Sequence, residues 1–214
     1  MTMTTRFLYI YDPLCGWCYG ASAGIATLAA QGDLTVEPMP RGLFAGKGAR
    51  TLDGAMSDHI MASDQRIATV TGAVFGASYH ERIAGSASLT LDSGPATLAL
   101  SAVARTAPMR ELEALGIIQR ARYVDGRDIT DAFVLIDLLV SAGLDAAAVT
   151  LANPAPGLRE ENRSRLEQAQ TVMRRFGVSG VPALFRIDGD RISPIDAAIL
   201  YHNPLSLVRS QGVA

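Results

Sequence analysis

The chain has 214 residues, of which 49% are hydrophobic and 19% are charged, and its formal net charge at pH 7 is −2. This size and composition predict a globular protein of one enlarged domain or two small ones, with enough chain to bury a core without disulfides or metals. The charges nearly balance, and the sequence shows no basic stripe with interleaved aromatic residues. This excludes nucleic acid and anionic membranes as expected partners.

The sequence gives no sign of a targeting segment or a membrane span. The first apolar run covers residues 7–11, which is shorter than the core of about 7–15 residues in a secretion signal. No uninterrupted apolar run approaches the about 18 residues of a membrane helix. The two cysteines both lie in one tetrapeptide, whereas a secreted scaffold usually spreads more of them along the chain. We therefore expect a cytoplasmic protein.

The first elements predicted along the chain are a strand, a helix and a second strand. Residues 6–11 form an apolar, aromatic and β-branched run that stops at Asp12-Pro13, as a buried strand does before a turn. From Cys18 the apolar positions fall at helical spacing, and this segment ends at Gln31-Gly32. Residues 34–39 alternate loosely and stop at Pro40. The order predicts one βαβ unit.

A block of about a hundred residues with helical character follows this unit. Separate helices are predicted over 56–74, from Pro95, from Pro108, from Thr130 or Asp131, and from Asp145, where proline or a capping residue suits a helix start. In the helix that starts near Asp131, the residues expected to face the core are Phe133, Ile136, Leu139 and Val140.

The last part of the chain returns to an α/β pattern. After Pro154–Gly157 a helix is predicted, with Leu166, Ala169, Met173 and Phe176 on one face. Residues 182–187 and 191–195 are two apolar runs around a turn that contains glycine, which indicates a hairpin. A final helix is expected near Asn203-Pro204. The pattern predicts an α/β domain made of residues 1–45 and 158–214, with an all-helical domain, residues 46–157, inserted between its halves.

The chemistry is concentrated in the tetrapeptide Cys15-Gly16-Trp17-Cys18. Cys15 follows the first strand and Cys18 is expected to begin the helix, where free amides and the helix dipole stabilise a thiolate. The two side chains lie one helical turn apart, so Cys18 can resolve a mixed disulfide formed by Cys15. A CxxC at a helix start within a βαβ unit is typical of a redox pair.

Two other interpretations of the cysteine pair are less well supported. Two thiolates could be half of a zinc site, but the chain has no other cysteine, and His59, His80 and His202 are scattered without paired ligand spacing. The thiols could also be inert and buried, since cysteine is often simply part of a core. We expect a redox pair and no metal.

Two segments of the sequence resemble those of a known family. The segment Asp12–Gly20 is similar to the active-site stretch of the DsbA-like branch of the thioredoxin superfamily, and especially to its cytosolic members often described as protein-disulfide isomerases. The segment Gly177–Phe185 is similar to that family's second hallmark, a Val-Pro at the start of a strand. The resemblance covers essentially the whole chain. It implies a thioredoxin-like fold, βαβ…αββα, with the helical domain between its halves.

The resemblance also implies roles for individual residues. Cys15 would be the nucleophile and Cys18 the resolving thiol. Pro182 would follow a cis peptide bond and pack against the cysteines, leaving the backbone of Val181 free to pair with an extended substrate segment. The expected activity is that of a thiol–disulfide oxidoreductase or protein disulfide isomerase. It would need no cofactor beyond the redox-active cysteines, with protein or small-molecule thiols and disulfides as partners and glutathione as a candidate co-substrate.

Three further residues near the pair have alternative interpretations. Gly16-Trp17 replaces the Pro-His of strongly oxidising relatives, which predicts a less oxidising couple. Trp17 is a candidate apolar platform for substrate, or it packs against the insert or Tyr19. Glu37 is a candidate proton acceptor beneath Cys18, although a solvated acid at a strand end is the favoured alternative. Asp12 is expected to be a turn residue.

Two competing functions stay open at this stage. The same fold and insertion occur in glutathione-dependent isomerases and kappa-class glutathione transferases, which typically carry serine at the nucleophile position and lack the second cysteine. Both cysteines are present here, which argues against that class. The other alternative is a redox sensor or chaperone-like binder that uses the cleft without turnover.

Overall fold

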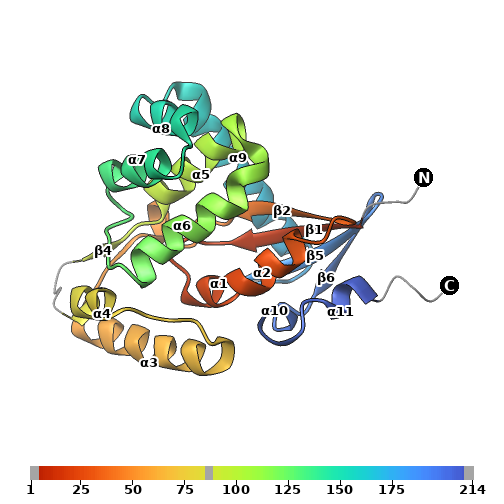
Figure 1. Cartoon of the computed structure of the whole chain (residues 1–214), viewed down its shortest axis with the longest axis horizontal. Coiled ribbons are helices and arrows are strands. Elements are labelled where there is room, and N and C mark those ends of the chain that lie inside the picture. Colours follow the sequence, from red (N-terminus) through yellow and green to blue (C-terminus); the bar gives the residue numbers. More distant parts are fainter. Residues whose placement is uncertain (1–4, 85–88, 210–214) are drawn as a thin grey trace.

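The computed structural model describes residues 5–84 and 89–209, and its centre is a four-stranded mixed sheet in the order β2-β1-β5-β6. β1 runs parallel to β2 and antiparallel to β5, and β5 pairs with β6 as a hairpin. The strands are β1 Thr5–Tyr11, β2 Leu34–Pro40, β5 Ala183–Asp188 and β6 Arg191–Ile195. The sheet thus unites the two ends of the chain, as the sequence analysis predicted (Figure 1).

The two faces of the sheet are covered by different helices. Alternate residues of β1 point to opposite faces. Phe7, Tyr9 and Tyr11 join the larger core cluster together with α1 and α2, whereas Leu8 and Ile10 join a smaller cluster with α9. The helices of this part of the fold are α1 Gly16–Gly20, α2 Ser22–Ala29, α9 Pro156–Arg175, α10 Ile199–His202 and α11 Ser206–Arg209. Figure 1 shows α2 lying along the sheet.

The segment between β2 and α9 is almost wholly helical. Its helices are α3 Gly54–Thr71, α4 Ala77–Ala84, α5 Gly94–Thr106, α6 Glu111–Tyr123, α7 Ala132–Ser141 and α8 Asp145–Ala152. α3 packs against α4 and α1, while α5 to α8 form a second group (Figure 1). A short antiparallel pair, β3 Arg50–Thr51 and β4 Thr90–Leu91, joins the ends of the first group. The predicted domain boundaries at 45/46 and 157/158 stay predictions.

Several local predictions are corrected by the structure. The helix after β1 begins at Gly16, because Cys15 and not Cys18 is its N-cap. Phe133 and Val140 do not face the core, since they are 82% and 50% exposed. α7 is apolar on almost all sides, so its sequence does not show which face packs, and the buried face holds Leu135, Leu138 and Leu139. The short elements α4, α10, β3 and β4 were not predicted.

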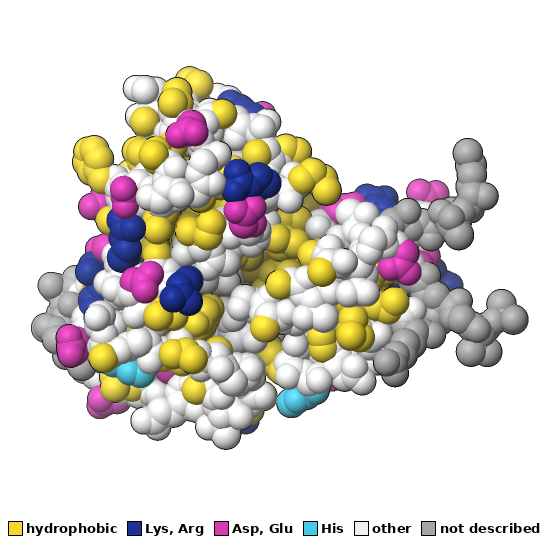
Figure 2. All heavy atoms as spheres, in the orientation of Figure 1, with side chains coloured by type: hydrophobic (Ala, Val, Ile, Leu, Met, Phe, Trp, Pro, Cys, Tyr) yellow, Lys and Arg dark blue, Asp and Glu magenta, His cyan; other side chains and the backbone are white. Residues whose placement is uncertain are grey.

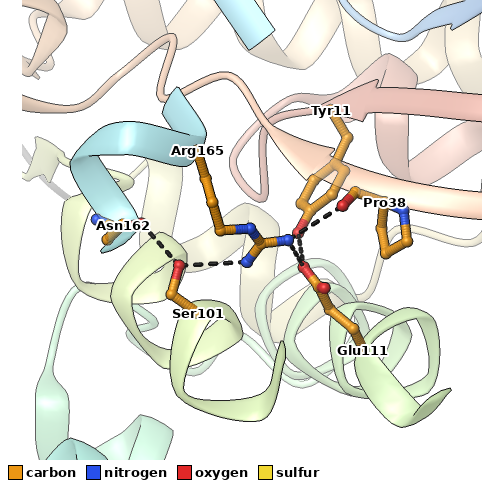
Figure 3. Close-up of polar contacts among 6 residues, drawn as sticks. All are labelled: Tyr11, Pro38, Ser101, Glu111, Asn162 and Arg165. Atoms are coloured by element: carbon orange, nitrogen blue, oxygen red, sulfur yellow. Dashed lines mark hydrogen bonds and ion pairs between the residues drawn. The ribbon is translucent and has the colours of Figure 1, made fainter. Parts of the chain in front are cut away.

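A buried polar network ties the helical insert to the sheet. The carboxylate of Glu111 on α6, 3% exposed, accepts hydrogen bonds from the Tyr11 hydroxyl at 3.1 Å and from the Arg165 guanidinium on α9 at 2.5 Å. Arg165 also donates to the Pro38 carbonyl at 3.0 Å and to the Ser101 hydroxyl at 3.2 Å (Figure 3). Burial raises the pKa of Glu111 above its ordinary value, and the charge and hydrogen bond of Arg165 offset only part of this rise. The Glu111–Arg165 ion pair and its hydrogen bonds thus connect two strands and three helices.

Candidate active site

Cys15 stands at the junction of β1 and α1, where the chain leaves the sheet. The turn Asp12-Pro13-Leu14 brings it there, and the Cys15 amide closes that turn by donating to the Asp12 carbonyl at 3.1 Å. Cys15 is the N-cap of α1, and its Sγ accepts a hydrogen bond from the Cys18 amide at 3.4 Å. An amide of the first turn of the helix, from its third residue, therefore points at this sulfur as it does at the acceptor of an N-cap.

The two cysteines differ in their access to solvent. Both are free thiols; Cys15 is 9% exposed and Cys18 is fully buried. Burial raises the pKa of Cys18 well above its ordinary value, and the hydrogen bond and charge of Cys15 raise it further. Cys18 is therefore held as a thiol until Cys15 has reacted. This asymmetry agrees with an attacking Cys15 and a resolving Cys18.

The segment Val181–Pro182 lies against Cys15, although 166 positions separate Cys15 and Val181 in the sequence. The Val181–Pro182 peptide bond is cis, the form that the resemblance implies. The Cys15 thiol donates a hydrogen bond to the Val181 carbonyl at 3.4 Å. Val181 is half-buried, and Cys15 is buried except for the 9% that is exposed. The structure thus brings Cys15, Cys18 and this backbone segment together, as expected.

Trp17 packs against a partner that the sequence analysis did not name. Its ring lies 5.5 Å from the ring of Tyr201 in α10, and the Tyr201 hydroxyl donates to the Trp17 carbonyl at 3.4 Å. Tyr19 instead stacks on Tyr123 at 4.7 Å. Trp17 is half-buried and its side chain still lines the cavity beside Cys15. Its role as a substrate platform stays a prediction.

The structure does not bring Glu37 to the cysteines. Glu37 forms an ion pair with Arg6 at 2.6 Å, and its side chain is 37% exposed. It pairs in register with Leu8, whose side chain faces α9, whereas Cys18 packs with Tyr9 on the other face of the sheet. The assignment of Glu37 as proton acceptor is therefore wrong. The favoured alternative of a solvated acid agrees with the structure, although Glu37 lies in the middle of β2 and not at a strand end.

Asp12 is the buried carboxylate beside the pair. Its Oδ1 accepts from the Leu14 amide at 2.8 Å, which confirms the turn role, and its Oδ2 accepts from the Ser93 hydroxyl at 2.8 Å and the Phe44 amide at 3.4 Å. Burial raises its pKa, and these hydrogen bonds lower it. Asp12 thus joins the Cys15 loop to the start of α5. The Asp-Pro pair three residues before Cys15 was the signal for this position.

A cavity of about 310 Å³ opens beside Cys15, between α1 and the helices of the insert. Two buried charged side chains line it, Asp64 of α3 and Arg122 of α6. Sequence analysis missed both, although Asp64 shares a helical face with Ile60 and Ile67. A larger hollow between α2 and α6, visible in Figure 2 as a hydrophobic recess, contains no cysteine.

The stability of the protein should depend on pH through Asp64. Burial raises the pKa of this carboxyl to about 6, although a hydrogen bond from Tyr79 and the charge of Arg122 lower it. A raised pKa means that the folded state binds more protons than the unfolded state. The free energy of unfolding therefore falls as the pH rises from the ordinary pKa of 3.8 to about 6.

Asp64→Asn cannot ionise and should escape this loss. Relative to the wild type, its free energy of unfolding should gain roughly 2.5 kcal/mol between about pH 4 and about pH 7.5, since each pKa unit corresponds to about 1.4 kcal/mol. Urea denaturation at the two pH values measures the difference. A difference between the two proteins that is the same at both values would contradict a buried, destabilising carboxylate.

Among residues 5–84 and 89–209, no group of three histidine, cysteine or acidic side chains is placed to hold a metal ion. Within the same residues no helix combines the length and apolar character required to cross a bilayer.

Solved structures of other proteins superpose on this chain over nearly its whole length. The chain superposes on the cytosolic disulfide reductase DsbM from Pseudomonas aeruginosa with a TM-score of 0.84 and 30% identity, covering 96% of this chain and 98% of that one. A second DsbM structure, with GSH, gives a TM-score of 0.78 at 29% identity over 96% and 98% of the two chains. No protein-family model and no curated protein matches the chain.

A more distant structure shares the same architecture. A protein from Nitrosomonas europaea, provisionally assigned as a protein disulfide isomerase, matches with a TM-score of 0.78 at 23% identity, covering 98% of this chain and 100% of that one. At this identity the match shows the fold alone. Together these neighbours confirm the predicted fold class, a thioredoxin-like α/β fold with an inserted helical domain.

Proposed function

Because the chain belongs to the DsbA-like family of thioredoxin-fold proteins, we propose that it is a thiol–disulfide oxidoreductase whose active groups are Cys15 and Cys18. The observation that carries the proposal is the asymmetric pair of free thiols. The Sγ of Cys15 accepts a hydrogen bond from the Cys18 amide and donates one to the Val181 carbonyl, whereas Cys18 is fully buried. The match with a protein described as a disulfide reductase supports it.

The reaction proceeds in two exchanges. The Cys15 thiolate attacks one sulfur of a substrate disulfide, so that a mixed disulfide forms and the other sulfur leaves as a thiolate that takes up a proton. Cys18 then loses its proton, attacks the Cys15 Sγ and releases the second substrate thiol. The protein dithiol gives up two electrons and becomes a Cys15–Cys18 disulfide. An external thiol restores the dithiol by the same steps in reverse.

The backbone at Val181 supports peptides as substrates. Its carbonyl lies beside Cys15, two residues before the start of β5, where an extended segment can add hydrogen bonds as strands do. Reduction and isomerisation of protein disulfides share this first exchange, and both belong to the proposal. A small thiol is the proposed electron donor, which the solved complex of DsbM with GSH supports. The description of DsbM as cytosolic supports a cytoplasmic setting.

The test is catalysed reduction of a protein disulfide. The purified chain, insulin and excess glutathione should release insulin thiols at a rate proportional to the concentration of the chain. If the chain also restores the activity of a substrate protein with scrambled disulfides, it has isomerase activity as well. A rate equal to that of glutathione alone, combined with binding of partners only to the oxidised chain, would reject the enzyme and indicate the redox sensor.

A further inference from the structure

The cavity beside Cys15 contains charges that an exchange between sulfur atoms does not need. Asp64 and Arg122, 3% and 4% exposed, come from different helices of the insert and line the same cavity as Cys15. Burying a charge is costly unless it is paired and hydrogen-bonded. Two buried charges of opposite sign beside a reactive sulfur therefore require an explanation.

Their hydrogen-bonding capacity is only partly used within the protein. Both side chains interact with the Tyr79 hydroxyl. In the part of the chain that the structure describes, however, the Nε of Arg122 and the Oδ2 of Asp64 have no hydrogen-bond partner, and no ion pair joins the two residues. Both atoms are closed to solvent, so a ligand that offers one group of each sign would complete them after a small rotation of each side chain into the cavity.

Arg122 is also held in place from two sides. Its guanidinium carbon lies 5.6 Å from the ring centre of Tyr79 and 5.5 Å from that of Tyr123. Such contacts with aromatic rings restrict a flexible side chain without using all of its N–H donors. A guanidinium fixed in this way can bind a carboxylate through two parallel hydrogen bonds.

We propose that this cavity binds the α-amino-acid end of a small disulfide, whose carboxylate contacts Arg122 and whose ammonium group contacts Asp64. The inference rests on the proposed function, because it adds a small-molecule substrate class, beside peptides, for the same Cys15. A cavity of about 310 Å³ suits a small molecule rather than a protein segment. Arg50 adds a second positive charge to the lining, so the carboxylate should contribute more than the ammonium group.

The charges position the disulfide for the first exchange. With its amino-acid end in the cavity, one sulfur meets Cys15, the S–S bond breaks, and the distal half leaves as a thiolate that takes up a proton. The bound half stays on Cys15 until Cys18, having lost its proton, attacks the Cys15 Sγ and releases it as a second thiol. The reduced protein supplies both electrons, so a single turnover needs no other reductant.

The experiment compares four disulfides that differ only in their charged ends. L-Cystine carries both groups, 3,3′-dithiodipropionate only the carboxylate, cystamine only the ammonium group, and bis(2-hydroxyethyl) disulfide neither. Single-turnover rate constants are measured with the reduced protein, and each is divided by the value for the hydroxyethyl compound. In the wild type, cystine should give the highest ratio.

Variants should change these ratios selectively. Arg122→Gln should lower the ratios for cystine and dithiodipropionate by about tenfold or more, the effect of a lost charge-assisted hydrogen bond pair. Asp64→Asn should lower those for cystine and cystamine by about threefold or more. Arg122→Lys should recover part of the dithiodipropionate ratio. Arg120→Gln and Asp58→Asn, exposed on the same two helices, should leave every ratio unchanged.

Two outcomes would overturn the inference while leaving the proposed function intact. One is a wild-type protein that reacts with all four compounds at equal rates. The other is Arg122→Gln and Arg122→Lys proteins that lose the same factor with every compound, which would assign the arginine to folding or to Cys15 itself. A wild-type protein that reacts with none of the four would instead reject the proposed function.

Discussion

Cys15→Ser should lower the rate of catalysed insulin reduction by at least about a thousandfold, because a serine hydroxyl neither ionises near neutral pH nor attacks a disulfide. Cys15 is the less buried cysteine, 9% exposed against 0% for Cys18, and its thiol donates a hydrogen bond to the Val181 carbonyl. The buried Cys18 cannot replace it, since burial keeps Cys18 protonated and away from substrate. The rate of thiol release over the glutathione background is the measurement.

Cys18→Ser is the matched variant for this prediction. It keeps the nucleophile and loses the resolving thiol, so it should react once and then stall as a mixed disulfide. A Cys15→Ser protein that keeps most of its activity would contradict the assignment. A Cys18→Ser protein that turns over with glutathione at the wild-type rate would favour the glutathione-dependent class instead.

Arg165→Ala should destabilise the folded protein by about 3 kcal/mol at neutral pH, because it leaves the Glu111 carboxylate buried without its cation. The Glu111 side chain is 4% exposed and keeps only the Tyr11 hydroxyl as a donor from the network in Figure 3. The Pro38 carbonyl and the Ser101 hydroxyl also lose the donor that the Arg165 guanidinium supplied. The free energy of unfolding is measured by urea denaturation.

The pH dependence separates this cause from lost packing. Without Arg165 the pKa of Glu111 in the folded state rises further above its unfolded value, so the folded state binds the extra proton. The destabilisation should therefore be smaller near about pH 4.5 than near about pH 7.5. Glu111→Gln in the Arg165→Ala background should restore part of the loss. The same loss at both pH values would show that the charge is not the cause.

Arg163→Ala is the control for the same helix. Arg163 pairs with Glu160 one turn away, and both side chains are about two-thirds exposed, at 64% and 66%. Such surface pairs contribute little to stability. If Arg163→Ala lowers the free energy of unfolding as much as Arg165→Ala does, any arginine of α9 stabilises the helix. The ion pair with Glu111 would then not be the cause of the loss.

The sequence predicts those parts of the fold and site that depend on neighbouring residues. The strand before Asp12, the helix after Cys15 and the hairpin around residues 188–190 have strong local signals, and the structure contains all three. The pair of cysteines one helical turn apart is also a local feature. The start of the helix was placed too late, because Cys15 caps it with its own sulfur, a role that cysteine seldom takes.

The remaining features depend on contacts between distant segments. Glu37 lies in a strand whose residues are mostly half-buried on both faces, so its sequence does not show which face the side chain takes. Tyr201, Asp64 and Arg122 reach the site from α10, α3 and α6, and only the folded chain brings these helices to Cys15. A charged residue on an apolar helix face indicates a buried polar position, but it does not show which other helices that residue will contact.

The most direct test of the two-cysteine mechanism is the identity of the trapped sulfur. The reduced Cys18→Ser protein is mixed with a disulfide-bonded cysteine peptide, quenched with acid, digested and mapped by mass spectrometry. We predict one peptide adduct per chain, on Cys15, and no adduct on the Cys15→Ser protein under the same conditions. An adduct that forms on Cys18 of the Cys15→Ser protein at a comparable rate, or no adduct in either variant, would contradict the mechanism.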